Sequence, residues 1–413
     1  METPPRGGEE TRPSSPAQRS SSEPVAVLYV SSSGNLGGAE QSLLQLITHL
    51  DRSRVKAMLV LPQGEGDEFF FAAEARGIPV QTLPMVPLRR TRNPLRLLAA
   101  LRDLRQSSRR IHRIARETGA RLVHANTTRA ALQAAFPPRK GGGVPLLWHN
   151  RDLNLPFLAG QTLGRSARAA IAVSAPVREL TGRYLPRDRI ALIQGGVDLS
   201  PYARLPGREE ARASLGISPE GPLLLCVAQH ARWKRQDLFL DILARIREIH
   251  PDARGLLAAR SAPPRTRTFF ETLQNHARRL GLQRAVIFRA FLPEQMPAVY
   301  AAGDVLVHMA EREPFGRALV EALASGLPIV AARGGGPDAI LEVGGGILTE
   351  PGNLDAALQS TLAYLRDGEA RQRLVEGRLE RASRFSAEGA AQKIASLYEA
   401  LEGEEYAPPS APF

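Results

Sequence analysis

The chain has 413 residues and a formal net charge of +12, with 43% hydrophobic and 23% charged residues. This composition excludes a wholly disordered, collagen-like or coiled-coil protein. A single core rarely grows past about 250–300 residues, so we expect two domains. The one cysteine, Cys226, excludes an intramolecular disulfide and a cysteine-based metal cluster, and its apolar surroundings indicate a buried thiol.

The first half of the chain alternates short apolar runs with helix-like segments. Residues 1–23 mix Pro, Ser, Gly and both charge signs without the apolar segment of a secretory signal, so we expect a disordered tail. A helix is expected over 39–50. The predicted strands are 25–30, 55–61, 80–83, 121–124, 146–149, 170–174 and 190–193. This alternation indicates βαβ units and a parallel sheet with helices on both faces.

The pattern breaks over 195–207, which holds three glycines and two prolines, and then resumes. Strands are predicted at 223–228, 255–258, 285–288, 305–308, 328–331 and 346–348. Residues 354–401 are helical in pattern, and Ser386 is the expected N-cap of a last helix of about 15 residues. We therefore predict an α/β chain with two Rossmann-like, doubly wound domains that face each other across a cleft. Their expected bounds are 24–200 and 201–385.

Ligands of open parallel sheets bind beyond the carboxyl ends of the strands, so the loops that follow strands are the places to seek chemistry. The first such loop, 31–40, contains Gly34, Gly37 and Gly38. Glycines let the backbone approach a phosphate, and the helix that follows favours an anion. The spacing matches neither a dinucleotide fingerprint nor a P-loop. A plain tight turn explains the loop equally well.

The loop after strand 223–228 carries Lys234, one of only four lysines in the chain. Its flexible ammonium suits a phosphate as a point charge. A solvated surface lysine is the alternative, but the place at a strand's carboxyl end favours function.

Two glutamates follow strand 305–308. Glu313 precedes a helix expected to begin near Gly316, and Glu321 lies eight residues further on. The two carboxylates could face different parts of one extended polar ligand, and the backbone N–H groups of Phe315 and Gly316 are potential donors. The glycines at 334–336, after strand 328–331, could cradle hydroxyls or phosphate, unless they form a plain loop.

These residues resemble the family 4 glycosyltransferases, which are retaining enzymes of the two-domain GT-B fold. The similarity of the second half rests on Glu313–Gly316 with Glu321, 326–331, 334–336, 195–198, 346–348 and 351–353. The similarity of the first half rests on Gly37–Glu40, 149–152 and 173–174. The resemblance covers about residues 25–401. It implies that a C-terminal helix, 386–402, packs back on the first domain, with a tail at 403–413.

The resemblance also implies a nucleotide-diphospho-sugar as co-substrate, with no metal and no tightly bound cofactor. Lys234 would neutralise the diphosphate and Glu313 would bind the sugar hydroxyls, and both are candidate catalytic residues. Glu321 would bind the ribose. The family often has an arginine five or six residues before the lysine, and Arg232 is a candidate replacement for it. The other expected donor-site residues are Gly37, Gly38, Phe315, Gly316 and Gly335.

The acceptor side of the cleft would be formed by the first domain. Its candidate residues are Glu40, His124, Asn126 and His149. For the last three, an ordinary buried polar residue at a strand end is an equal interpretation.

Residues 86–116 hold ten arginines and a single acid, Asp103, and predict an amphipathic basic helix from Leu95 onward. The segment is either a solvated face or a surface for an anionic membrane that carries a lipid-linked acceptor. An acidic saccharide acceptor would use the same charges. Nucleic acid is not expected, because aromatic side chains do not interleave the arginines.

The sequence thus favours a retaining glycosyltransferase acting on a saccharide or lipid-linked acceptor, in cell-surface glycan or glycolipid synthesis. The alternatives are an inactive sugar-nucleotide-binding or membrane-surface protein and a sugar-nucleotide epimerase on the same fold. No run of 18 apolar residues occurs. We expect a cytoplasmic protein, peripheral on the inner face of the membrane if the arginines dock there.

Overall fold

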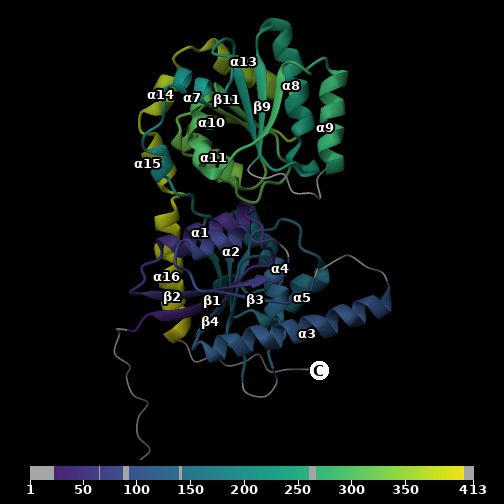
Figure 1. Cartoon of the computed structure of the whole chain (residues 1–413), viewed down its shortest axis with the longest axis vertical. Helices are drawn as coiled ribbons and strands as arrows, with labels where there is room; N and C mark the ends of the chain where they lie inside the picture. Colours follow the sequence, from purple (N-terminus) through teal and green to yellow (C-terminus); the bar gives the residue numbers. More distant parts are fainter. Residues whose placement is uncertain (1–22, 65, 87–92, 139–141, 260–266, 404–413) are drawn as a thin grey trace, which may run out of the picture.

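The computed structural model describes residues 23–64, 66–86, 93–138, 142–259 and 267–403, which form two α/β units (Figure 1). The first sheet consists of β1 (Val25–Val30), β2 (Val55–Pro62), β3 (Val80–Leu83), β4 (Leu122–Ala125), β5 (Leu146–Asn150), β6 (Ala169–Ala172) and β7 (Ile190–Leu192). The second consists of β8 (Leu223–Val227), β9 (Arg254–Ala259), β10 (Val286–Ala290), β11 (Val305–His308), β12 (Ile329–Ala332) and β13 (Gly346–Thr349). Every predicted strand is present, with ends within two residues of the prediction.

Both sheets are parallel and have the same kind of strand order. The order is β3-β2-β1-β4-β5-β6-β7 in the first and β10-β9-β8-β11-β12-β13 in the second. Each therefore has the Rossmann order, with its switch point between β1 and β4 or between β8 and β11. The strands read as apolar runs because helices cover both faces, and β8, which contains Cys226, is buried throughout. The predicted fold class is confirmed.

Helices join the strands and cover the sheets. Those of the first half are α1 (Gly38–His49), α2 (Glu68–Glu74), α3 (Pro94–Glu117), α4 (Thr128–Ala134), α5 (Phe157–Ser166) and α6 (Ala175–Thr181). The second half adds α7 (Arg208–Ser214), α8 (Gln236–Ile249), α9 (Arg267–Arg279), α10 (Met296–Ala302), α11 (Arg317–Ala324) and α12 (Gly336–Leu341). It ends with α13 (Leu354–Arg366), α14 (Ala370–Val375), α15 (Arg378–Ser383) and α16 (Ala387–Gly403).

The last helix, α16, returns to the first sheet and packs beside α1 (Figure 1). Ser386 caps it as expected, because its hydroxyl accepts the N–H of Gly389 at 3.1 Å. The hydroxyl of Tyr398 lies 3.0 Å from that of Tyr29 on β1. The expectation that the C-terminal helix packs on the first domain is confirmed, while the residue numbers of the domain bounds stay a prediction.

The chain passes between the two units twice, and the two passages are hydrogen-bonded to each other. Val197 donates its N–H to the carbonyl of Phe385, and Ala387 donates to the carbonyl of Val197, both at 2.9 Å. A methyl group on Gly196 would lie 2.4 Å from the Cα atom of Ala387. The close approach of the two passages therefore requires glycine at 196.

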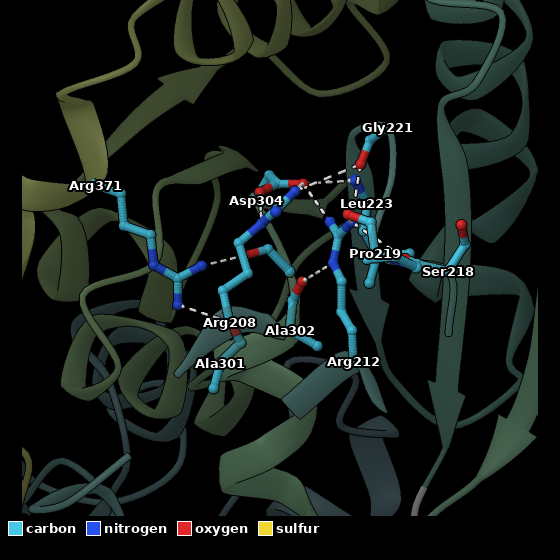
Figure 2. Close-up of polar contacts among 11 residues, drawn as sticks. Arg208, Arg212, Ser218, Pro219, Gly221, Leu223, Ala301, Ala302, Asp304 and Arg371 are labelled. Atoms are coloured by element: carbon cyan, nitrogen blue, oxygen red, sulfur yellow. Dashed lines mark hydrogen bonds and ion pairs between the residues drawn. The ribbon is translucent and has the colours of Figure 1, made fainter. Parts of the chain in front are cut away.

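At the amino-terminal end of the second sheet, Asp304 forms ion pairs with Arg208 and Arg212 (Figure 2). Its carboxylate accepts from Arg208 Nε at 2.8 Å, from Arg212 Nη2 at 2.7 Å and from the N–H of Leu223 at 2.7 Å. The guanidinium of Arg212, which is fully buried, also donates to backbone carbonyls at 2.8–3.3 Å. This cluster ties α7 to the starts of β8 and β11, away from the loops that follow the strands.

Candidate active site

Lys234 and Glu313 form an ion pair beyond the carboxyl ends of β8 and β11. Lys234 lies in a short 3₁₀ turn, Arg232–Lys234, and Glu313 lies in the loop before α11. The two side chains are only 15% and 7% exposed. Because β8 and β11 are neighbours at the switch point, two residues 79 positions apart in sequence meet.

The carboxylate of Glu313 also accepts a hydrogen bond from Nε2 of His308 at 3.1 Å. Burial raises the pKa of Glu313, but the charge of Lys234 and the bond from His308 outweigh it and hold the pKa at about 2. Glu313 is therefore ionised at neutral pH and presents a fixed negative charge beside a fixed positive one.

A second set of contacts holds the two loops together. The N–H of Glu311 donates to the carbonyl of Trp233 at 2.8 Å, and Arg235 reaches the Glu311 carboxylate at 2.5 Å. Arg235 also binds both oxygens of Asp237. Arg232, a candidate for the diphosphate site, is exposed at the start of the same turn.

The glycine loop after β12 packs directly on the Glu313 loop. The N–H of Gly336 donates to the carbonyl of Glu313 at 2.9 Å, and a methyl group on Gly336 would lie 1.7 Å from the carbonyl oxygen of Phe315. The N–H groups of Gly334 and Gly335 donate to the Asp338 carboxylate at 2.6 and 3.0 Å. These three amides already have partners within the protein, so the role of this loop toward hydroxyls or phosphate stays a prediction. Gly335 lines the cavity between the two units.

Glu321 lies on α11 and is 1% exposed. It accepts a hydrogen bond from the hydroxyl of Tyr300 at 2.8 Å and lies 3.6 Å from Arg317, one turn earlier. The helix begins at Arg317, directly after Gly316, whose φ of 100° suits glycine. The side chain of Phe315 is buried and packs on Phe385, with ring centroids 6.3 Å apart.

The glycine loop of the first domain faces this site. A methyl group on Gly37 would lie 3.6 Å from the side-chain nitrogen of Gln229, in the loop after β8, and 2.8 Å from the carboxylate of Glu40. Gly38, by contrast, opens onto free space. Glu40 is 7% exposed, and burial raises its pKa despite the nearby charge of Arg151. A side chain at position 37 would therefore displace the Glu40 carboxylate.

His124 and His149 belong to a buried polar chain rather than to an open surface. His124 is fully buried, with Nδ1 2.5 Å from the hydroxyl of Tyr398 and Nε2 3.0 Å from Nδ1 of His149. Burial and the nearby Arg151 lower the pKa of His124 to about 3, so the ring is neutral. For His124 this geometry favours the interpretation of a satisfied buried residue. The Nε2 atom of His149 is buried and has no hydrogen-bond partner among the described residues.

Arg151, which the sequence pattern did not single out, links several polar residues at the carboxyl ends of the first sheet. Its guanidinium donates to the side-chain oxygen of Asn126 at 3.0 Å and to the hydroxyl of Ser42 on α1 at 3.1 Å. Asn126 in turn donates to the carbonyl of Ala39 at 3.0 Å. The available signal was the polar run 149–152 directly after a predicted strand. In an arginine-rich chain, one more arginine carried little weight.

A cleft separates the units beside this site. One cavity of about 370 Å³ is lined by residues of both: Leu153, Pro176, Glu179, Leu180, Arg183, Arg312, Gly334, Gly335 and Asp338. Arg312 crosses the cleft and donates to the carbonyl of Leu153 at 3.0 Å.

Within the described ranges, no group of three or more His, Cys, Asp or Glu side chains is placed to hold a metal ion. None of the described helices combines the length and apolarity needed to cross a membrane.

Among curated proteins, the D-inositol 3-phosphate glycosyltransferase of Corynebacterium efficiens is 32% identical over 218 residues, which cover 51% of this chain and 51% of that protein. The protein of the same name from Corynebacterium glutamicum is 29% identical over 284 residues, covering 67% of this chain and 66% of that protein. The chain thus spans about half to two thirds of the length of these relatives.

Among solved structures, the Anabaena protein HepE in complex with UDP-glucose is 25% identical and superimposes with a TM-score of 0.74, covering 91% of this chain and 99% of that one. Family models match both halves of the chain. Residues 36–201 match the model described as Glycosyltransferase Family 4, and residues 207–380 match the model described as Glycosyl transferases group 1. The chain belongs to the family 4 glycosyltransferases and has the GT-B fold.

Proposed function

We propose that the protein is a retaining glycosyltransferase that moves a sugar from a nucleotide-diphospho-sugar to an acceptor. The observation that carries this proposal is the ion pair of Lys234 and Glu313 at the switch point of the second sheet, opposite the glycine loop of the first domain. A fixed cation and a fixed carboxylate at one point suit a ligand that is part phosphate and part polyol. The complex of HepE with UDP-glucose supports the same class of donor.

In this proposal Lys234 neutralises the diphosphate and Glu313 binds hydroxyls of the sugar. Departure of the diphosphate concentrates negative charge on its oxygens, and a preorganised ammonium stabilises that charge most in the transition state. Arg232 is the second candidate cation. Glu321 is proposed to bind the ribose, which requires it to leave or share its bonds with Tyr300 and Arg317.

The other donor contacts in this proposal come from the backbone. Gly37 and Gly38 approach the diphosphate from the first domain, and the N–H groups of Phe315 and Gly316 donate to the ligand. Gly335 shapes the pocket wall beside them. Each role is proposed for a glycine or for a residue whose side chain is buried.

Retention in the family is a displacement on one face of the sugar. The bond from C1 to the diphosphate breaks, the acceptor oxygen bonds to C1 on the same face, and a donor phosphate oxygen takes the acceptor's proton. This step needs no protein base, which agrees with the low pKa of Glu313, about 2, because a carboxylate of that pKa is a weak proton acceptor. The chemistry thus depends on holding the two substrates in place.

On the acceptor side we propose Glu40, Asn126 and His149, with Arg151 fixing their positions. The acceptor classes to test are saccharides and lipid-linked saccharides, and the names of the curated relatives add a phosphorylated inositol. The amino-terminal turns of α3 support a membrane-bound acceptor. Leu95, Leu97 and Leu98 are 74%, 48% and 63% exposed there. Arginines 89, 90 and 92 of the predicted basic segment lie outside the described residues.

The test is transfer from UDP-, GDP- and ADP-sugars to such acceptors, measured as nucleotide release with formation of glycosylated product. We expect Lys234→Ala and Glu313→Gln each to lose about 100-fold or more of the transfer rate. Lys393→Ala removes an exposed lysine on α16 and should keep full activity. Nucleotide binding without transfer would instead support an inactive sugar-nucleotide-binding protein. An altered sugar nucleotide formed without acceptor would support an epimerase.

A further inference from the structure

Trp233 lies at the edge of the candidate donor site and is 41% exposed. The ammonium of its neighbour Lys234 sits over the indole ring, 4.0 Å from the centroid. Lys234 therefore has two partners, the carboxylate of Glu313 on one side and an aromatic face on the other. A cation close to an indole face is attracted by the ring quadrupole.

The backbone of Trp233 is fixed although its side chain is exposed. Its carbonyl accepts the N–H of Glu311 at 2.8 Å, and the next residue but one, Arg235, clamps both Asp237 and Glu311. The indole is thus carried on a rigid turn without contributing to a buried core. A large exposed aromatic side chain on a rigid turn is better explained by what it does for Lys234 than by packing.

We propose that Trp233 is a positioning residue that holds the Lys234 ammonium in the cleft, and that its ring forms an edge of the site for the diphosphate. A lysine side chain has four rotatable bonds, and ordering it opposes binding. The Glu313 carboxylate and the indole face both restrict the ammonium before the ligand arrives, so less side-chain entropy is lost when the diphosphate binds. The proposal rests on the proposed function, because it assumes that Lys234 meets a nucleoside diphosphate.

The first test compares binding of UDP, GDP and ADP by calorimetry in the full chain. Trp233→Leu removes the aromatic face but keeps an apolar side chain, whereas Trp233→Phe keeps an aromatic face. For the nucleotide that the unaltered chain binds best, we expect the Leu variant to raise Kd by about twofold to fivefold and the Phe variant to recover part of that loss. Phe71→Leu removes an aromatic side chain that is 63% exposed on α2, and should leave Kd unchanged.

The melting temperature of each variant without nucleotide separates positioning from folding. Because the indole is exposed, all three variants should melt close to the unaltered chain. Equal Kd values for the unaltered chain and Trp233→Leu would overturn the proposal. If the unaltered chain binds none of the three nucleotides, both the proposal and the proposed function fail. If Lys234→Ala also binds the nucleotide normally, the donor-site assignment fails as well.

A second readout uses the fluorescence of the tryptophans themselves. The chain has two, and Trp148 on β5 is fully buried, so quenching by acrylamide reports mainly on Trp233. Saturating nucleotide should lower the quenching constant of the unaltered chain. Unchanged quenching at a nucleotide concentration that calorimetry shows to be saturating would contradict the placement of the ring at the site.

Discussion

Arg235 and Arg312 both have left-handed backbone, with φ of 50° and 53°, and they flank the Lys234–Glu313 ion pair. Arg235 directly follows the lysine and Arg312 directly precedes the glutamate. The described residues contain no other non-glycine residue with positive φ. Such backbone costs free energy and persists where the surroundings impose it, commonly at functional sites. Here the ion pairs of Arg235 hold one of the two loops, and the backbone bond from the Gly336 N–H to the Glu313 carbonyl holds the other.

This strain can be measured at Arg312. Arg312→Ala and Arg312→Gly both lose the hydrogen bond to Leu153, so they differ in how they tolerate a positive φ and in the freedom that glycine adds to the unfolded chain. We expect the Gly variant to have a free energy of unfolding about 1 kcal/mol higher than the Ala variant. Urea unfolding monitored by circular dichroism measures the difference.

Arg333 provides the matched control for that comparison. It is exposed, and its φ is not in the left-handed region. At position 333 the Ala variant should have the higher free energy of unfolding, because glycine there only adds freedom to the unfolded chain. Gly and Ala variants of Arg312 with equal stability would mean that the backbone relaxes without cost.

The low pKa of Glu313 predicts how its ion pair depends on pH. Because the folded-state pKa of about 2 lies below the ordinary value of 4.5, ionised Glu313 stabilises the fold fully above about pH 4.5. That stabilisation, about 3 kcal/mol by linkage, is lost as the pH falls toward 2. The unaltered chain should therefore exceed Glu313→Gln in stability at pH 7, by an amount that shrinks between pH 4.5 and 3. Urea unfolding at several pH values tests this, and a difference that stays constant over that range argues against the low pKa.

Asp304 should matter far more for stability than an exposed acid in a similar ion pair. Asp304→Ala leaves the buried guanidinium of Arg212 without its carboxylate, and we expect a loss of about 3–5 kcal/mol. Asp355 pairs with Arg245 at 2.6 Å, but its side chain is 81% exposed, so Asp355→Ala should change the unfolding transition little. Similar effects of the two substitutions on thermal unfolding would show that the Asp304 cluster adds nothing beyond a surface pair.

The strands could be predicted well from the sequence because the burial of a strand on both faces is visible in its own residues. A strand covered on both faces needs an unbroken apolar run, and Leu223–Val227 shows this plainly. Lys234, Glu313 and Gly37 could be singled out for a related reason, since they lie in the polar or glycine-containing loops that follow such runs.

Contacts that depend on strand order and on the return of the chain could not be predicted in this way. The pairing of Lys234 with Glu313 requires β8 and β11 to be neighbours. The burial of His124 is completed by Tyr398, 274 residues away, on the returning α16. The left-handed backbone of Arg235 and Arg312 could not be predicted either. Glycine or asparagine is typical of positive φ, and both positions hold arginine.

The exposed end of α3 predicts binding to anionic membranes. Further along the helix, Leu104 and Ile111 pack on the first domain, whereas the leucines of the first turns face solvent among arginines. Apolar side chains that enter the interface and arginines that attract anionic headgroups act together. The full chain should therefore sediment with phosphatidylglycerol vesicles, less with phosphatidylcholine vesicles, and less at high salt.

Paired variants separate the two contributions. Combining Arg96→Gln with Arg102→Gln should weaken vesicle binding about tenfold or more, because each basic residue near the surface contributes about 1 kcal/mol. The same change at Arg278 and Arg279, exposed on α9 of the second domain, should have little effect. At high salt, where charge attraction is screened, combining Leu95→Ser with Leu98→Ser should lower vesicle binding below that of the unaltered chain. Phe71→Ser on α2 should not. Equal binding to charged and neutral vesicles, or equal effects of the α3 and α9 substitutions, would remove α3 as the docking surface and leave its arginines as a solvated face.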